Sequence, residues 1–353
     1  MKVLFSPICI GSMIVKNRFV RSATQDWLGD ENGHLTDRSY AFYEELAKND
    51  VGLIVTAHSY VEHPRGKASP KQNAIYDDSF IDGYAKLADI AHTYGSKLVL
   101  QASHSGVQTT REVTHGVTPA EPNALTETEI RDIIVRYAQA ARRAQWAGCD
   151  GVQFHLAHGY LLSRFLSPQT NHRTDRWGGS VENRMNIIKE IIIQTRQLVG
   201  DRFPIMVKLN STGGFDGTAA INMNDVVKIA VILEQIGVCA IEVSGGVASE
   251  TKNSLSQTGI LKKEQEGYFA ENAKMIKEAV HIPIILVGGL RSQSVMEKIL
   301  ENHTADMVSM SRPFVREPDI VRRFYSGQNK AACISCNKCS NMKGIACPFN
   351  KKY

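Results

Sequence analysis

The strongest constraint on the fold is an alternation of short apolar runs with longer segments of helical periodicity. The apolar runs are bounded by Gly, Pro or polar residues and span residues 19–24, 51–57, 97–104, 151–155, 204–210, 239–244, 283–287 and 306–310. Most of them are nearly continuous in apolar residues, which is typical of strands buried on both faces of a parallel sheet. The segments between them place apolar residues three and four apart and span residues 82–94, 126–147, 182–199, 224–236, 265–280, 295–301 and 319–324.

Eight units of strand followed by helix predict a closed (β/α)₈ TIM barrel of the α/β class. An open, doubly wound sheet would also alternate, but it usually carries a glycine-rich turn after its first strand. The first run leads into residues 22–25, which contain no glycine. We therefore expect the barrel to occupy residues 1–325 and a short tail to occupy residues 326–353.

Composition and charge exclude several classes of protein. The chain has 353 residues, of which 43% are hydrophobic, and this is enough for a substantial core and argues against disorder. Its formal net charge of +5 comes from scattered residues, so we expect no nucleic-acid-binding tail, although the charge would help to attract anionic substrates. No signal-peptide pattern is present, and no segment approaches the roughly 20 apolar residues of a membrane helix. We expect a cytoplasmic protein that binds neither nucleic acid nor membranes.

The fourth apolar run ends in a cluster of polar aromatic residues, namely His155, His158 and Tyr160. In a barrel the catalytic residues lie at the carboxyl ends of the strands, where this cluster is expected. Two imidazole N–H groups can donate hydrogen bonds to one carbonyl oxygen, and a phenol can supply a proton. The alternatives are core histidines or a metal pair, but no acidic or Cys partner lies at a usual spacing from them.

Several motifs around this cluster resemble the Old Yellow Enzyme family. Residues 11–18, Gly-Ser-Met-Ile-Val-Lys-Asn-Arg, are similar to the opening segment of that family. Residues 155–184 contain His-x-x-His-Gly-Tyr, Phe-Leu-Ser-Pro, Asn-x-Arg-x-Asp and Gly-Gly-Ser-x-Glu-Asn-Arg, which together resemble its signature. The resemblance implies a (β/α)₈ barrel that binds FMN and takes electrons from NAD(P)H. It also implies transfer of a hydride to the activated C=C bond of an unsaturated carbonyl or dienoyl compound.

The same resemblance implies a role for individual residues. His155 and His158 would hold the substrate carbonyl oxygen, and Tyr160 would protonate the substrate. Lys208 stands where many members have Arg, and a cation there can stabilise negative charge on the reduced flavin ring. Gln101 resembles the Gln that hydrogen-bonds that ring. The full set of implied FMN contacts is Ser22, Ala23, Thr24, Ala57, Gln101, Lys208, Gly288, Gly289, Ser311 and Arg312.

The last four of these residues follow the seventh and eighth apolar runs. Barrels commonly bind phosphate with these two loops and a nearby helix N-terminus, so we expect the FMN phosphate there. Three positions depart from the family. Its members often have Pro where this chain has Ala23, Cys or Thr where it has Gln25, and Gly where it has Ser311. The departures at Ala23 and Gln25 affect the expected redox tuning of the flavin.

The tail contains four of the seven cysteines of the chain, Cys333, Cys336, Cys339 and Cys347. In a chain without an export signal such a cluster indicates metal binding or redox activity more than a disulfide framework. The spacing Cys-x₂-Cys-x₂-Cys with a later Cys-Pro is typical of iron–sulfur ligands, while a structural zinc suits four thiolates equally well. Bare thiols are the third reading. The subgroup that includes 2,4-dienoyl-CoA reductase shares a Cys-rich tail, and this resemblance favours a 4Fe–4S cluster.

Two alternative functions stay open at this point. The first is an FMN barrel oxidoreductase that receives electrons through the cysteine cluster from a separate electron-donor protein. Members of the related subgroup usually have a second, dinucleotide-binding half after the cysteines, and the sequence stops before one. The second is a non-catalytic flavin electron carrier, which would have no need of a pair of histidines and a tyrosine around a carbonyl group. A small-molecule substrate is the principal expected partner, and a homo-oligomer is also compatible with the sequence.

Overall fold

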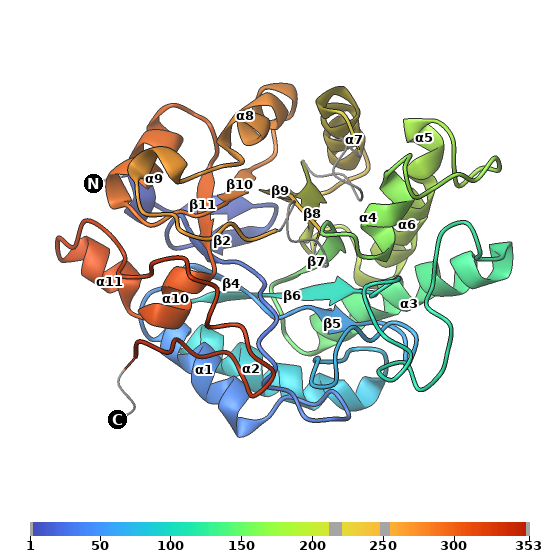
Figure 1. The fold of residues 1–353 in the computed structure, drawn as a ribbon, viewed down its shortest axis with the longest axis horizontal. Coiled ribbons are helices and arrows are strands. Elements are labelled where there is room, and N and C mark those ends of the chain that lie inside the picture. The colour runs from blue at the N-terminus through green and yellow to red at the C-terminus, as the bar shows by residue number, and fades with distance from the viewer. Residues whose placement is uncertain (1–2, 212–220, 248–254, 351–353) are drawn as a thin grey trace.

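The computed structural model describes residues 3–211, 221–247 and 255–350 (Figure 1). Eight parallel strands form a closed barrel in the order β4-β3-β11-β10-β9-β8-β7-β6, and pairing of β4 with β6 closes it. The strands are β3 (Phe19–Arg21), β4 (Leu53–Val55), β6 (Lys97–Ser103), β7 (Gly151–Leu156), β8 (Ile205–Asn210), β9 (Ala240–Ser244), β10 (Ile284–Val287) and β11 (Met307–Met310). Each lies within a predicted run except β7, which continues one residue further. The predicted (β/α)₈ fold is confirmed.

Helices surround the barrel and alternate with its strands (Figure 1). The longer ones are α1 (Asp37–Ala47), α2 (Ile81–Thr93), α3 (Glu127–Trp146), α6 (Asn186–Val199), α7 (Met223–Gln235), α8 (Ala270–Ala279) and α9 (Gln293–Glu301). The shorter ones are α4 (Leu161–Leu166), α5 (Val181–Arg184), α10 (Arg312–Arg316) and α11 (Ile320–Tyr325). The start of α3 follows from its sequence, because Thr126 and Glu129 form a capping box, with the Thr126 N–H donating to Glu129 Oε2 at 2.8 Å.

Helix α1 was not predicted, and its composition explains why. Its buried face consists of Ser39, Tyr43, Leu46 and Ala47, so this face contains only one large aliphatic residue. Helical periodicity is recognised from aliphatic residues three and four apart, and this segment offers too few of them.

An antiparallel hairpin of β1 (Ile8–Ile10) and β2 (Met13–Val15) closes the amino-terminal end of the barrel. Its buried side chains join an apolar cluster inside the barrel that consists of Ile10, Met13, Val15, Val20, Leu53, Val55, Val99, Met206, Ala240, Ile285 and Met307. A larger core lies between the strands and the surrounding helices. Because the interior of the barrel is apolar near its amino-terminal end, the polar side chains of the strands can gather only near the carboxyl ends of the strands.

The chain after α11 folds back onto the barrel (Figure 1). The Ala331 N–H donates to the Arg291 carbonyl at 2.8 Å, and the Ile345 N–H donates to the Asp26 carbonyl at 2.7 Å. Ile345 also packs against Leu28 and Val315 in a small apolar cluster. The predicted tail, of which residues 351–353 lie outside the described residues, is therefore packed against the barrel over the part that is described.

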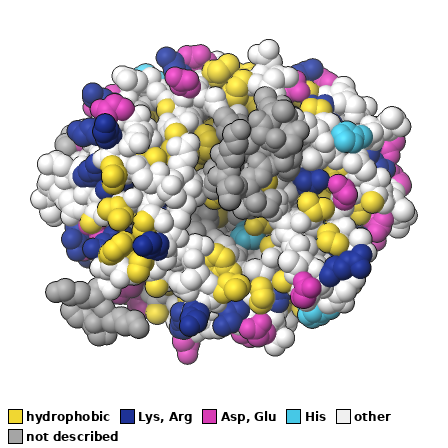
Figure 2. Space-filling model, viewed as in Figure 1, with side chains coloured by type: hydrophobic (Ala, Val, Ile, Leu, Met, Phe, Trp, Pro, Cys, Tyr) yellow, Lys and Arg dark blue, Asp and Glu magenta, His cyan; other side chains and the backbone are white. Residues whose placement is uncertain are grey.

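Charged side chains of both signs lie on the surface. On the face in Figure 2, basic and acidic side chains are interspersed around the molecule and do not form a single basic patch. Among the described residues, no helix combines the length and the apolar character needed to cross a membrane.

Candidate active site

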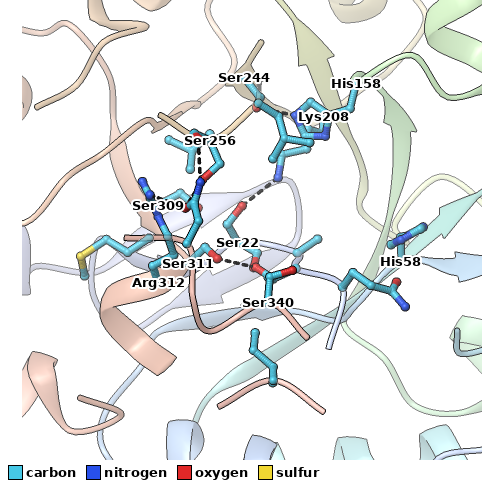
Figure 3. Close-up of a pocket in the computed structure, with 18 of the residues that line it drawn as sticks. Ser22, His58, His158, Lys208, Ser244, Ser256, Ser309, Ser311, Arg312 and Ser340 are labelled. Atoms are coloured by element: carbon cyan, nitrogen blue, oxygen red, sulfur yellow. Dashed lines mark hydrogen bonds between the residues drawn. The ribbon is translucent and has the colours of Figure 1, made fainter. Parts of the chain in front are cut away.

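A cavity of about 660 Å³ lies at the carboxyl ends of the barrel strands (Figure 3). Its volume is within the range of roughly 300–1,000 Å³ that is usual for ligand pockets. Every residue predicted to be catalytic or to contact the cofactor lines this cavity except Ala57 and Gly288. The Ala57 N–H donates to the Tyr43 hydroxyl at 2.7 Å, and the Gly288 carbonyl accepts from the Gly267 N–H at 2.7 Å. The backbones of these two residues are therefore engaged within the protein.

The three predicted catalytic side chains lie together on one wall. The ring centroid of His155, at the end of β7, is 4.9 Å from that of His158 and 4.8 Å from that of Tyr160. His158 has a φ of 64°, a conformation that costs energy for a residue with a Cβ. Two contacts hold it there: its Nε2 lies 2.8 Å from Ser244 Oγ, and its N–H donates to Asn210 Oδ1 at 3.3 Å.

Burial determines the charge state of this cluster. Burial, together with neighbouring His158 and Lys208, lowers the pKa of His155 well below its ordinary value. Burial and Lys208 lower the pKa of His158 in the same way. Burial raises the pKa of Tyr160 to about 12. At neutral pH the wall therefore consists of two neutral imidazoles and a protonated phenol.

A buried ion pair lies beside the cavity, which its lysine, Lys208, lines. Lys208 on β8 and Glu242 on β9 are 3% and 0% exposed, and Lys208 Nζ lies 3.2 Å from Glu242 Oε2. Lys208 Nζ also donates to Ser22 Oγ at 2.7 Å (Figure 3). The hydroxyls of Ser22 and Ser309 donate to Glu242 Oε1 at 2.7 and 2.8 Å. Burial alone would raise the pKa of Glu242, but Lys208 and these hydroxyls lower it below its ordinary value, so the carboxylate is ionised.

A chain of amides connects this ion pair to the third barrel strand. Gln153 Nε2 donates to Glu242 Oε2 at 3.0 Å, and Gln101 Nε2 donates to Gln153 Oε1 at 2.6 Å. Gln101 is thus held in a fixed orientation, with its side chain at the cavity wall. Neither Glu242 nor Gln153 was predicted, although a carboxylate and an amide inside buried runs were visible signals, since such groups require partners.

The predicted phosphate end of the cavity contains Gly289, Ser311 and Arg312. Gly289 has a φ of 68°, and a Cβ there would come within 2.8 Å of the Tyr268 ring, so both conformation and space require glycine. Ser311 Oγ accepts from Thr24 Oγ1 at 2.7 Å, which ties the ends of the first and eighth strands together (Figure 3).

The tail contributes to the same cavity, which the sequence did not predict. Ser335, Asn337, Cys339, Ser340 and Ile345 line it. Arg312 Nη1 donates to Asn337 Oδ1 at 2.7 Å, so a tail residue holds the side chain predicted to bind phosphate. The tail is therefore one wall of the candidate site.

The four tail cysteines line a second, small cavity that shares Arg312, Asn337 and Cys339 with the large one. All four are free thiols, and burial raises the pKa of Cys333 and Cys339. Within the described ranges, no group of three or more His, Cys, Asp or Glu side chains has an arrangement that could hold a metal ion. The thiols are gathered but not arranged as ligands, and the predicted metal site stays a prediction.

The sequence and the fold are similar to those of known flavin oxidoreductases. The profile of the NADH:flavin oxidoreductase / NADH oxidase family matches residues 3–331. An NADH oxidase of Thermoanaerobacter brockii is 34% identical over 348 residues, which are 95% of this chain and 52% of that protein. An NADPH dehydrogenase of Clostridium acetobutylicum is 31% identical over 328 residues, which are 90% of this chain and 93% of that protein.

Two solved structures show the similarity of the fold. A complex of 2-naphthoyl-CoA reductase with 2-naphthoyl-CoA superposes with a TM-score of 0.87 at 28% identity, over 96% of this chain and 54% of that chain. An old yellow enzyme homologue from Zymomonas mobilis superposes with a TM-score of 0.78 at 24% identity, over 93% and 94% of the two chains. The chain spans about half the length of the NADH oxidase and of the naphthoyl-CoA reductase. Because the family profile covers nearly the whole sequence, the chain belongs to the NADH:flavin oxidoreductase / NADH oxidase family, and it shares the fold of the old yellow enzyme homologue.

Proposed function

We propose that this protein is an FMN-dependent ene-reductase with NAD(P)H as its electron source. It transfers a hydride from reduced FMN to the activated C=C bond of an α,β-unsaturated carbonyl or dienoyl compound. The observation that carries the proposal is the convergence of two neutral imidazoles and a protonated phenol on one cavity wall. This set suits a substrate with a carbonyl oxygen to be polarised and a carbon to be protonated.

The residues present fit FMN by the chemistry of their side chains. A buried cation, Lys208, is available to the flavin ring together with Gln101. At the other end, Gly289 leaves the backbone open to close approach, and Ser311 and Arg312 would hold the phosphate. When bound, FMN supplies the hydride.

The chain's own residues would act on the substrate as follows. His155 and His158 donate hydrogen bonds to the carbonyl oxygen and stabilise the negative charge that builds there. Ser244 fixes the orientation of His158 through their 2.8 Å contact. Tyr160, with a pKa of about 12, holds a proton at neutral pH and donates it to the carbon next to the carbonyl group.

The substrate class is supported by proteins similar to this chain. Solved structures of similar fold include morphinone reductase and a 2-naphthoyl-CoA reductase with its CoA ester. An acyl-CoA substrate would bring an anionic group, and the net charge of +5 is favourable for it.

A direct test is to purify the protein and record its absorbance spectrum before and after anaerobic addition of NADH or NADPH. We expect bands of a bound flavin that are bleached by at least one of the two nucleotides, and mass spectrometry of the released cofactor should identify FMN. A purified, folded protein that neither contains nor takes up FMN would contradict the proposal.

Arg312→Ala should reduce the affinity for FMN. The guanidinium is a bidentate partner for phosphate, and a lost charge-assisted hydrogen bond costs about 1.5–3 kcal/mol, or roughly 10- to 150-fold in the dissociation constant. The measurement is FMN titration of the apoprotein followed by fluorescence. Arg316→Ala is the matched control, because Arg316 lies on the same helix but does not line the large cavity. Equal affinity in Arg312→Ala and the wild type would refute the phosphate assignment.

The position of the tail favours a second candidate function, in which electrons reach FMN from a partner protein through a metal centre. Cys339 lines both the large cavity and the cysteine cavity, so a centre held by the four thiols would lie next to the flavin site. A 4Fe–4S cluster suits this role, and a structural zinc is the alternative. Thiolates are needed for either, and metal binding would offset the raised pKa of Cys333 and Cys339.

Assays for iron, sulfide and zinc on anaerobically purified protein should find one metal centre per chain, lost in Cys336→Ser. If the centre relays electrons, the variant keeps FMN but accepts electrons from a one-electron donor more slowly, while reduction by NAD(P)H is unchanged. If the centre is structural, the variant is less stable and both routes of reduction are unchanged in the folded fraction. Four titratable thiols without metal in the anaerobic protein would exclude both roles.

A further inference from the structure

His58 is a third histidine at the cavity, and neither the sequence signature nor the mechanism above assigns it a role. It lies three residues after the end of β4, is 6% exposed and lines the large cavity (Figure 3). Its ring centroid is 5.1 Å from that of Tyr160 and 6.2 Å from that of His155. The rings of Tyr160, His155 and His58 therefore form a compact triangle.

The surrounding hydrogen bonds indicate where His58 carries its proton. The Ala68 N–H donates to Gln72 Oε1 at 2.6 Å, which identifies the oxygen of that amide. Gln72 Nε2 then lies 2.9 Å from His58 Nδ1 and donates to the His58 carbonyl at 3.1 Å. Because an amide nitrogen can only donate, its contact with Nδ1 favours an accepting, unprotonated Nδ1, and the Ser103 hydroxyl, 3.0 Å from the same nitrogen, is also able to donate to it. A neutral imidazole in this arrangement carries its proton on Nε2.

The cavity side of the ring is the free side. His58 Nδ1 is engaged in the wall by Gln72 and by Ser103 Oγ at 3.0 Å, and both of these residues are fully buried. His58 Nε2 has no hydrogen-bond partner in the described part of the chain. Unlike His155 Nδ1, it is not one of the side-chain atoms that are both buried and without a partner. Burial and Lys208 also lower the pKa of His58 to about 4, so the ring is neutral at neutral pH.

We propose that His58 is a substrate-binding residue whose Nε2–H donates a hydrogen bond to a second acceptor oxygen of the substrate. Gln72 is the positioning residue that fixes this tautomer. With one carbonyl oxygen held by His155 and His158, the site is then selective for unsaturated compounds that carry a second carbonyl or carboxyl oxygen. This inference rests on the proposed ene-reductase function.

Two substrates that differ by one carbonyl group test the selectivity. They are 2,6,6-trimethylcyclohex-2-ene-1,4-dione and 2,6,6-trimethylcyclohex-2-enone, compared in the holoenzyme. In His58→Leu, which removes the donor, we expect KM for the dione to rise about two- to tenfold, the usual effect of one lost neutral hydrogen bond, with KM for the mono-enone unchanged. In His58→Gln, which keeps an N–H donor, we expect most of the dione selectivity to return. Equal effects on the two substrates would overturn the proposal.

Nuclear magnetic resonance of the wild-type protein tests the tautomer without a kinetic assay. With ¹⁵N-labelled histidine, the His58 signals are identified by their absence in His58→Gln, and we expect the neutral Nε2–H form at pH 7. An Nδ1–H or doubly protonated ring would overturn the assignment. A wild-type enzyme whose reduced flavin is reoxidised neither by these compounds nor by acyclic and CoA-linked enoyl compounds would instead refute the proposed function, and with it the substrate role of His58, while the tautomer is still decided by the spectrum.

Discussion

Tyr160→Phe should slow the reoxidation of reduced flavin by an enone about 10²–10⁴-fold, which is the usual contribution of general acid catalysis. The change removes only the hydroxyl and keeps the ring that packs beside His155 and His58. The phenol is protonated at neutral pH in the wild type, because burial raises the pKa of Tyr160 to about 12. Stopped-flow mixing of the anaerobically reduced enzyme with cyclohex-2-enone measures this step alone.

The reductive half-reaction provides an internal control for this prediction. NAD(P)H reduction and FMN content should be unchanged in Tyr160→Phe, since the hydroxyl has no part in them. Tyr325→Phe, on the exposed side of α11, should behave as the wild type in both half-reactions, because Tyr325 is 75% exposed. If Tyr160→Phe slows reduction by NAD(P)H and leaves reoxidation intact, Tyr160 is not the proton donor.

Glu242→Ala should lower the free energy of unfolding by about 3–5 kcal/mol, the usual cost of removing one partner of a buried ion pair. The variant leaves Lys208, which is 3% exposed, without its carboxylate, and it also leaves the hydroxyls of Ser22 and Ser309 and the amide of Gln153 without their acceptor. Urea unfolding of the FMN-saturated proteins at pH 7 measures the difference. A loss below 1 kcal/mol would contradict the assignment of Glu242 as the counter-ion of Lys208.

The double variant Lys208→Met/Glu242→Leu provides the matched control. Replacing both charges by apolar side chains removes the unpaired ion, so much of the lost stability should return, whereas FMN affinity should not. The effect of Glu242→Ala should also depend on pH. The pKa of Glu242 in the folded protein is below its ordinary value of about 4.3, so its stabilisation is present above that pH and is lost as the pH falls through the folded pKa. The difference between wild type and Glu242→Ala should therefore shrink at pH 3.

The sequence predicted what depends on residues close together in the chain. The buried runs identified the barrel strands, and the end of the fourth run identified the rim position of His155, His158 and Tyr160. These two inferences use only the period of a strand and the geometry of a barrel. Lys208, in the fifth run, was identified through the resemblance to the Old Yellow Enzyme family.

The remaining site residues depend on contacts between segments far apart in the sequence. His58 Nδ1 contacts Gln72, which lies 14 residues away, and Arg312 is held by Asn337 from the tail. The spacing of the tail cysteines predicted their clustering, but only the packed tail shows that Asn337 and Cys339 line the large cavity. Periodicity carries no information about such contacts, so they appear only in the three-dimensional structure.

The central claim is that this chain passes a hydride to an activated double bond. The most direct measurement is to reduce the purified flavoprotein with one equivalent of NAD(P)H without oxygen, add cyclohex-2-enone, and follow the flavin absorbance and the organic product together. The account predicts that the oxidised flavin spectrum returns, that cyclohexanone forms in equal amount, and that His158→Ala slows this step about 10²–10³-fold. A flavin that stays reduced in the presence of cyclohex-2-enone and of acyclic and CoA-linked enoyl compounds would contradict the claim.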